Sequence, residues 1–303
     1  MNTHGAAGRA RRTWPRACRG VSWREAGLAL ALVVAAVLAT GDAWSDIAHI
    51  ALRDDEASQV LLAPVVAAWL FWIRRGRLRH FRPEHLWAGP ALIVLGWTAY
   101  LLGDRFLVQS AWHLGALLVA LGALASVLGG GVLVRFGPAV AALAFLVPVP
   151  GRLRQAIALP LQAATAHVTQ ALLDTLGFDV ERLGSVLRVN GHEVMVAEAC
   201  NGLRMVFALV AVSFAFAYGV PLRNGIRMLV LGLSPLTAVA FNVLRLVPVV
   251  LGYGYFEEPF ANQLHDLSAW VMLPCSFLAL LGVTRVLRWA HVPVSRFVLA
   301  YGT

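Results

Sequence analysis

Residues 228–250 read Met-Leu-Val-Leu-Gly-Leu-Ser-Pro-Leu-Thr-Ala-Val-Ala-Phe-Asn-Val-Leu-Arg-Leu-Val-Pro-Val-Val, and the run holds one ionisable side chain, that of Arg245. An α-helix needs about 20 apolar residues to cross the hydrocarbon core of a bilayer, so this run predicts a transmembrane helix. Comparable apolar runs recur at about 26–42, 57–73, 86–102, 106–128, 131–148, 201–220 and 267–284. The sequence therefore predicts an all-α polytopic membrane protein with about eight transmembrane helices.

The composition supports this fold class. The 303 residues are 59% hydrophobic and 14% charged, and the mean hydropathy is +0.71, which leaves no room for a large soluble domain. The net charge of +9 comes from arginine alone, without a single lysine. The arginines fall in short segments between apolar runs, so the charge indicates membrane orientation rather than nucleic-acid binding. The three cysteines show no metal-ligand spacing, and we expect neither a metal site nor another cofactor.

The arginines are distributed unevenly between the two sides of the predicted membrane domain. With a cytoplasmic N-terminus, seventeen arginines lie in inside segments and six in outside segments, as the positive-inside rule requires. We interpret residues 1–25 as a basic cytoplasmic tail, 26–290 as the transmembrane domain and 291–303 as a cytoplasmic C-terminal tail. A cleaved signal peptide is the alternative interpretation of the N-terminus.

The outer segment 149–199 has a different pattern. Residues 153–176 intersperse polar with apolar side chains and predict an amphipathic helix on or in the outer face. If this helix crossed the membrane, every later element would change sides and the inside segments would lose their arginines. In the run 185–196, two β-prone stretches flank Asn190-Gly191, which predicts a tight hairpin. A short outer helix and a β-hairpin thus precede Cys200.

Three reactive residues converge on the outer face in this topology. Cys200 begins the sixth span, where the helix dipole favours a thiolate. Arg245 lies near the outer end of the seventh span, where an arginine is costly and marks a function or a buried partner. His265 lies just before the eighth span. Each residue also has a non-functional interpretation: Cys200 as a small apolar residue, Arg245 as an arginine that snorkels to the interface, and His265 as an interfacial polar residue. Composition does not distinguish His265 from His49, His167 and His192, which lie on the same predicted side.

Four polar residues accompany these three. Arg204 follows Cys200 by four residues and Asn242 precedes Arg245 by three, the spacings of one helix face. Glu198 and Asn201 are either a capping pair for the sixth helix or part of the site.

These motifs together resemble the exosortase/archaeosortase family of membrane cysteine transpeptidases. Glu198-Ala199-Cys200-Asn201-Gly202-Leu203-Arg204 resembles the E-A-C-S-G-[LI]-R box of that family. Asn242 to Arg245 matches an N-x-x-R element, and His265-Asp266-Leu267-Ser268-Ala269-Trp270 resembles the final histidine motif. Weaker echoes are Leu146-Val147-Pro148-Val149-Pro150 and the outer segment with Asp46 and His49. Two departures, Asn201 for Ser and Ala269 for Gly, leave the recognition tripeptide open.

The resemblance implies roles and partners. Cys200 would be the nucleophile, Arg245 the group that stabilises negative charge, and His265 the acid and base. The substrates would be exported proteins whose C-terminal sorting signal joins a short motif (PEP-CTERM-like), a membrane helix and an arginine-rich tail. Cleavage would occur at the periplasmic face of a bacterial inner membrane, with transfer to an anchor or to exopolysaccharide-associated material.

Two other functions remain open at this point. A transporter or lipid-binding scaffold would use Arg245 to pair an anionic headgroup and would not need Cys200. An intramembrane cysteine protease would form the same thioester but never join the product to a new amine. The sequence leaves the acceptor and the oligomeric state undetermined.

Overall fold

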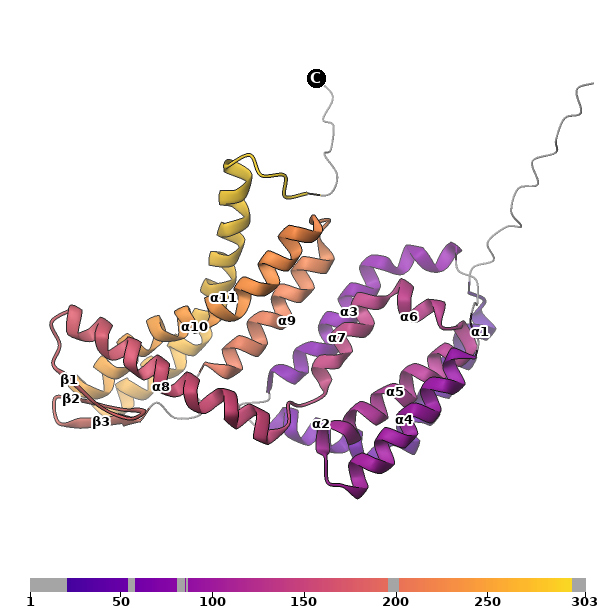
Figure 1. The fold of residues 1–303 in the computed structure, drawn as a ribbon, viewed down its shortest axis with the longest axis horizontal. Helices are drawn as coiled ribbons and strands as arrows, with labels where there is room; N and C mark the ends of the chain where they lie inside the picture. Colours follow the sequence, from indigo (N-terminus) through magenta and orange to yellow (C-terminus); the bar gives the residue numbers. More distant parts are fainter. Residues whose placement is uncertain (1–20, 54–57, 81–84, 86, 196–201, 296–303) are drawn as a thin grey trace, which may run out of the picture.

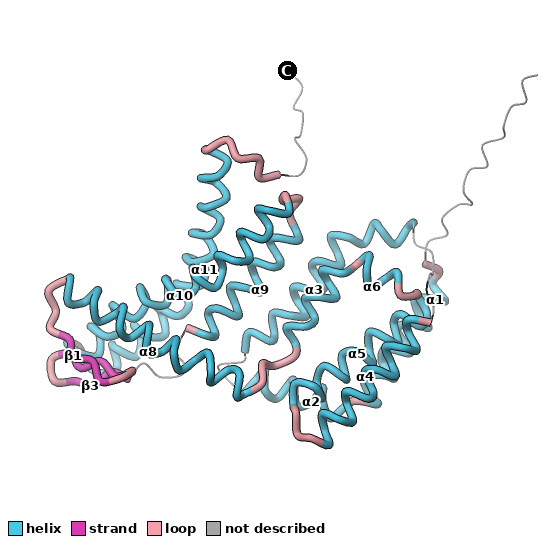
Figure 2. Tube along the Cα trace, viewed as in Figure 1, coloured by secondary structure: helices cyan, strands magenta, loops and turns pink. Residues whose placement is uncertain are grey.

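The structure is a computed structural model that describes residues 21–53, 58–80, 85, 87–195 and 202–295. Its elements in chain order are α1 (Trp23–Ala39), α2 (Gly41–Arg53), η1 (Ser58–Leu61), α3 (Leu62–Arg74), η2 (Arg75–His80), α4 (Ala88–Arg105), α5 (Gln109–Leu128), α6 (Gly131–Arg135), α7 (Gly137–Leu143), η3 (Ala144–Leu146), α8 (Gly151–Thr175), β1 (Val180–Leu183), β2 (Val186–Val189), β3 (His192–Met195), α9 (Leu203–Gly219), α10 (Asn224–Tyr255) and α11 (Glu258–Trp289). Helices make up most of the described chain, and the strands lie together at one corner (Figures 1 and 2).

The apolar helices fit a protein that crosses the membrane repeatedly. Each of α5, α10 and α11 is long and apolar enough to span a bilayer by itself. Two bent pairs meet the same criterion only when taken together: α1 with α2, bent by 79°, and α7–η3 with α8, bent by 84°. The described residues thus offer three to five candidate spans in a polytopic helical protein, and the count of eight stays a prediction.

Three predicted boundaries are wrong, each for a local reason. The run 131–148 is broken into α6, α7 and η3, because Phe136 leaves helical geometry (φ −103°, ψ 20°) and Pro138 opens α7. Helix α9 begins at Leu203 rather than 201, after Gly202 in the left-handed region (φ 80°). Helix α11 begins at Glu258 rather than 267, because its first two turns are polar and escape a search for apolar runs.

Glycines allow α4 and α5 to pack backbone against backbone. Gly96 faces the second helix so closely that a Cβ built on it would lie 2.7 Å from the Val119 amide nitrogen. Gly89 and Gly103, seven residues to either side, meet Ser126 and Trp112 in the same way. Close approach through small residues is the usual means by which membrane helices associate, since lipid removes most of the hydrophobic drive.

In the described part of the second half of the chain, α10 is the central helix. Helix α10 packs against both α9 and α11, and α9 also packs against α3 (Figure 1). Met205 and Leu209 of α9 and Ala238 of α10 form a buried cluster with partly buried side chains of α11. This cluster packs α10 and α11 against α9 and so holds the two long helices in place relative to each other.

Helix α8 and the strands cover the C-terminal part of α10. Most of the buried side chains of α8 are small or polar: Ala158, Gln162, Thr165, Ala166, Thr169 and Leu173. In contrast, Ile157, Leu159 and Val168 of α8 are exposed. Large apolar side chains on the surface of the protein are typical of a helix in contact with lipid. Whether α8 crosses the membrane stays a prediction.

The strands form one antiparallel sheet in the order β1-β2-β3. Strands β2 and β3 meet at Asn190-Gly191, both with positive φ (51° and 79°), as a two-residue turn of this type requires. The sequence analysis predicts two strands, and β1 is a third strand that it did not assign. Leu187 and Val189 are fully buried against Leu246 and Val250 of α10. The sheet is therefore anchored beside Arg245.

Replacing Gly96 by Val should separate α4 from α5. The added side chain would meet backbone atoms that cannot yield, and we expect a loss of at least about 1–3 kcal/mol of stability. The midpoint of thermal unfolding in detergent measures this loss. Gly282→Val is the matched control, because a Cβ on Gly282 of α11 would meet nothing within 4 Å. Equal midpoints for the two variants would contradict the close packing.

Candidate active site

Arg245 is a charged residue held inside the helical bundle. It lies on α10 with only 7% of its surface exposed, and Asn242, one turn earlier on the same helix, is fully buried. A guanidinium removed from water is stabilised only when its N–H groups find acceptors. The position of Arg245 therefore depends on its partners.

Helix α11 supplies two of these partners. Arg245 Nη2 lies 3.1 Å from His265 Nε2, and Arg245 Nε donates to Ser268 Oγ at 3.4 Å. His265 and Ser268 lie three residues apart on α11, so both reach the same side of α10. Ser268 Oγ also donates to the backbone carbonyl of His265 at 2.7 Å. The structure thus brings together the arginine and the histidine that the sequence singled out.

The contact with Arg245 assigns a hydrogen-bond role to one ring nitrogen of His265. A guanidinium has no acceptor, so Arg245 must donate and His265 Nε2 must accept without a proton of its own. The neutral ring then carries its proton on Nδ1, which donates to Asp266 Oδ1 at 3.2 Å. The His265 side chain is 25% exposed.

The segment with Glu198, Cys200 and Asn201 lies outside the described residues, and the structure resumes at Gly202. Gly202 is buried, and a Cβ added to it would lie 2.9 Å from the side chain of Asn242. Its φ of 80° also favours glycine. Two residues after Cys200, the chain is thus seated one helical turn from Arg245. The convergence of Cys200 with Arg245 and His265 stays a prediction.

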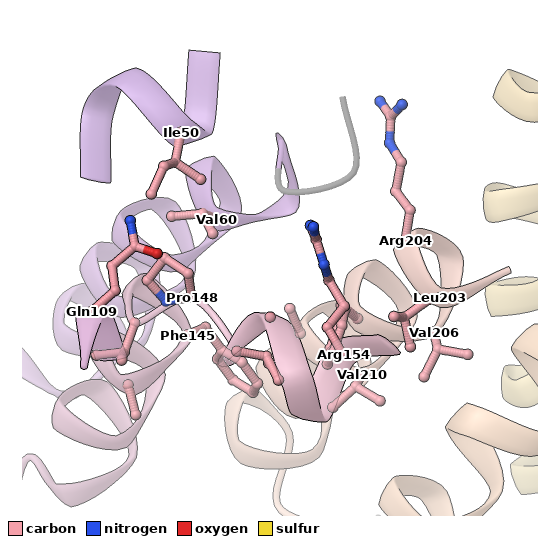
Figure 3. Close-up of a pocket in the computed structure, with 16 residues that line it drawn as sticks. Ile50, Val60, Gln109, Phe145, Pro148, Arg154, Leu203, Arg204, Val206 and Val210 are labelled. Atoms are coloured by element: carbon pink, nitrogen blue, oxygen red, sulfur yellow. The ribbon is translucent and has the colours of Figure 1, made fainter. Parts of the chain in front are cut away.

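Arg204 lies apart from the Arg245 pair. It is exposed in the first turn of α9 and makes no hydrogen bond with the described residues. The helical face that Arg204 is predicted to share with Cys200 stays a prediction, because Cys200 lies outside the described residues and α9 begins at Leu203. Arg204 instead lines a cavity of about 470 Å³, together with Arg154 of α8 and Gln109 of α5 (Figure 3). The extended segment Val147–Val149 forms another part of the wall.

A second polar cluster adjoins this cavity. Asp46 of α2 contacts the fully buried His113 of α5 at 2.9 Å and accepts from Gln109 Nε2 at 2.8 Å. His49, the other residue of the weak outer motif, is exposed and makes no polar contact with described residues. The sequence analysis missed His113 because it lies inside an apolar span. Its spacing of four from Gln109 is the signal that points to a shared polar face.

One family comparison matches the chain. The family described as transmembrane exosortase matches residues 44–282, which covers most of the chain. No curated protein and no solved structure matches this chain.

Ser268→Ala should weaken the site without unfolding the protein. The hydroxyl is one acceptor of a charged group at a long distance, so we expect cleavage of a sorting-tail reporter to slow by about threefold to tenfold. Ser276→Ala is the control, because Ser276 is equally buried on α11 but bonds only the Leu273 carbonyl among described residues. Cleavage rates are measured in membranes at equal enzyme levels. An equal loss in both variants would mean that Ser268 has only a structural role.

Proposed function

The chain belongs to the transmembrane exosortase family, and on this premise we propose that it is a membrane-embedded cysteine protease and transpeptidase. Its substrates are exported proteins with a C-terminal sorting signal that includes a membrane helix and a basic tail. The hydrogen bond between Arg245 and His265 across two helices is the observation that supports this proposal best. The seating of Gly202 on Asn242 supports the presence of Cys200 at the same site.

The first step forms a thioester. His265 Nε2 takes the proton of the Cys200 thiol, and the thiolate attacks the carbonyl carbon of the scissile peptide bond. A proton on Nε2 ends its capacity to accept from Arg245, so the guanidinium turns to the oxyanion of the tetrahedral intermediate. The C–N bond then breaks, and the leaving amine receives the proton from Nε2.

The second step resolves the thioester. An amine or water gives its proton to His265 Nε2 and attacks the thioester carbonyl carbon. The C–S bond breaks, and the proton on Nε2 passes to the leaving thiolate, which restores the Cys200 thiol and the neutral His265. An amine nucleophile gives a product joined to a new group, whereas water gives a free carboxylate. Ser268 keeps Arg245 in place through both steps.

The membrane supplies orientation. The helix of the substrate fixes the depth of its scissile bond, which converts the attack into an effectively intramolecular step. The arginine distribution supports a site that faces the periplasm in a bacterial inner membrane. Glu198 and Asn201 join the active segment in this proposal, and Arg204 contacts the substrate through the adjacent cavity.

Processing of a reporter with a sorting tail from the same genome tests this function. Cys200→Ala should abolish cleavage, because no other group replaces a thiolate nucleophile. The mature C-terminus is determined by mass spectrometry, in which an added mass reveals transfer.

Cys275→Ala is the matched control, since Cys275 is a partly buried free cysteine of α11. It should leave cleavage unchanged. Cleavage that persists in the Cys200 variant would favour the alternative of a transporter or lipid-binding scaffold. Cleavage with only a free carboxylate product would favour a simple intramembrane protease.

A further inference from the structure

A second cavity lies where α3 ends, α9 ends and α10 begins. Its volume is about 620 Å³, and its wall carries the arginines Arg74, Arg77, Arg135 and Arg227. No acidic side chain lines it among the described residues. We propose that this cavity binds the phosphate of an anionic phospholipid.

Backbone carbonyls hold three of the arginines in place. Arg74 Nη2 donates to the Tyr218 carbonyl at 2.6 Å, and Arg227 Nε donates to the Ala217 carbonyl at 2.9 Å. Arg77 Nη1 donates to the carbonyl of Arg135 at 3.0 Å. Arg227 also lies 4.7 Å above the ring of Tyr218. The cations near the last turn of α9 suit its dipole, but neutral carbonyls do not cancel several like charges.

Arg74 indicates that a further acceptor belongs in the cavity. Its Nη1 atom is buried and has no hydrogen-bond partner among the described residues. A buried donor without an acceptor costs free energy, and more so when the group is charged. The oxygens of one phosphate would accept from Arg74 and reduce the repulsion among its neighbours. The wall therefore fits a phosphate by both hydrogen bonding and charge.

The apolar part of the wall favours a lipid over a free phosphate. Ile73, Val134 and Pro138 line the same cavity, and Val134 is 84% exposed. Trp72 beside it is 62% exposed and stacks under the Arg75 guanidinium at 3.6 Å. A tryptophan beside arginines is typical of the membrane interface. Acyl chains on Ile73 and Val134 would leave the phosphate among the arginines.

The position of the cavity agrees with the predicted orientation. All four arginines are among the seventeen that the positive-inside rule assigns to the cytoplasmic side. Arg227 and Arg245 lie on one helix, and their spacing corresponds to roughly 27 Å along the axis, close to the thickness of the hydrocarbon core. The lipid site and the candidate active site therefore lie at opposite faces. Basic pockets between helices on the cytoplasmic side are a known type of anionic lipid site.

Native mass spectrometry of the full chain in neutral detergent tests the site. Phosphatidylglycerol is titrated against phosphatidylcholine and inorganic phosphate. We expect the wild-type protein to bind phosphatidylglycerol at least about fivefold more tightly than phosphatidylcholine. The Arg74→Gln variant should bind phosphatidylglycerol about fivefold more weakly than the wild type does.

The control is Arg288→Gln, which removes an exposed arginine of the same predicted face outside the cavity and should not change the affinity. Arg77→Gln provides a second variant if Arg74→Gln fails to fold, because Arg77 is exposed and makes one hydrogen bond to described residues. Equal affinities in the cavity variants and the control would overturn the assignment. So would inorganic phosphate that binds as tightly as the lipid, or a phosphatidylcholine affinity equal to that of phosphatidylglycerol. The readout is binding, so it is independent of the proposed catalysis.

Discussion

The buried guanidinium of Arg245 is the constraint on which the second half of the structure depends. A charge within a membrane helix is tolerated only when the surrounding protein satisfies it. His265 and Ser268 meet this requirement from α11, so the pairing of α10 with α11 is tied to the burial of this charge. In the contact with Arg245, His265 Nε2 is the acceptor, because a guanidinium can only donate. The residues that stabilise the buried guanidinium thus include the histidine to which the proposed mechanism assigns proton transfer.

Helix α10 carries one arginine near each end, and the two arginines lie in different surroundings. At its start, Arg227 is held by carbonyls of α9 among other arginines, and near its outer end Arg245 is enclosed by side chains of α11. The separation of these arginines approaches the thickness of the hydrocarbon core. An anionic lipid at the first site would hold the helix at a fixed depth. The active-site residues at the other end would then meet the substrate at a constant height.

The sequence predicted much of this architecture because apolar length and arginine spacing follow directly from the bilayer. The turn at Asn190-Gly191 was also visible in the sequence, since this type of turn needs positive φ. Ser268 and His113 were not assigned to a site, because each acts through a partner on another helix. The early start of α11 was hidden by its polar first turns. The glycine contacts between α4 and α5 depend on which faces of the two helices pack together. A single sequence does not specify this pairing of faces.

The central claim is that Cys200 acts as the nucleophile beside Arg245 and His265. Capture of the acyl-enzyme tests it most directly: membranes that process a reporter are quenched with acid, and the peptide containing Cys200 is identified by mass spectrometry. The account predicts the mass of the reporter fragment on Cys200, released by hydroxylamine as a thioester must be. Rapid processing with the covalent fragment on another residue, such as Cys275, would contradict it.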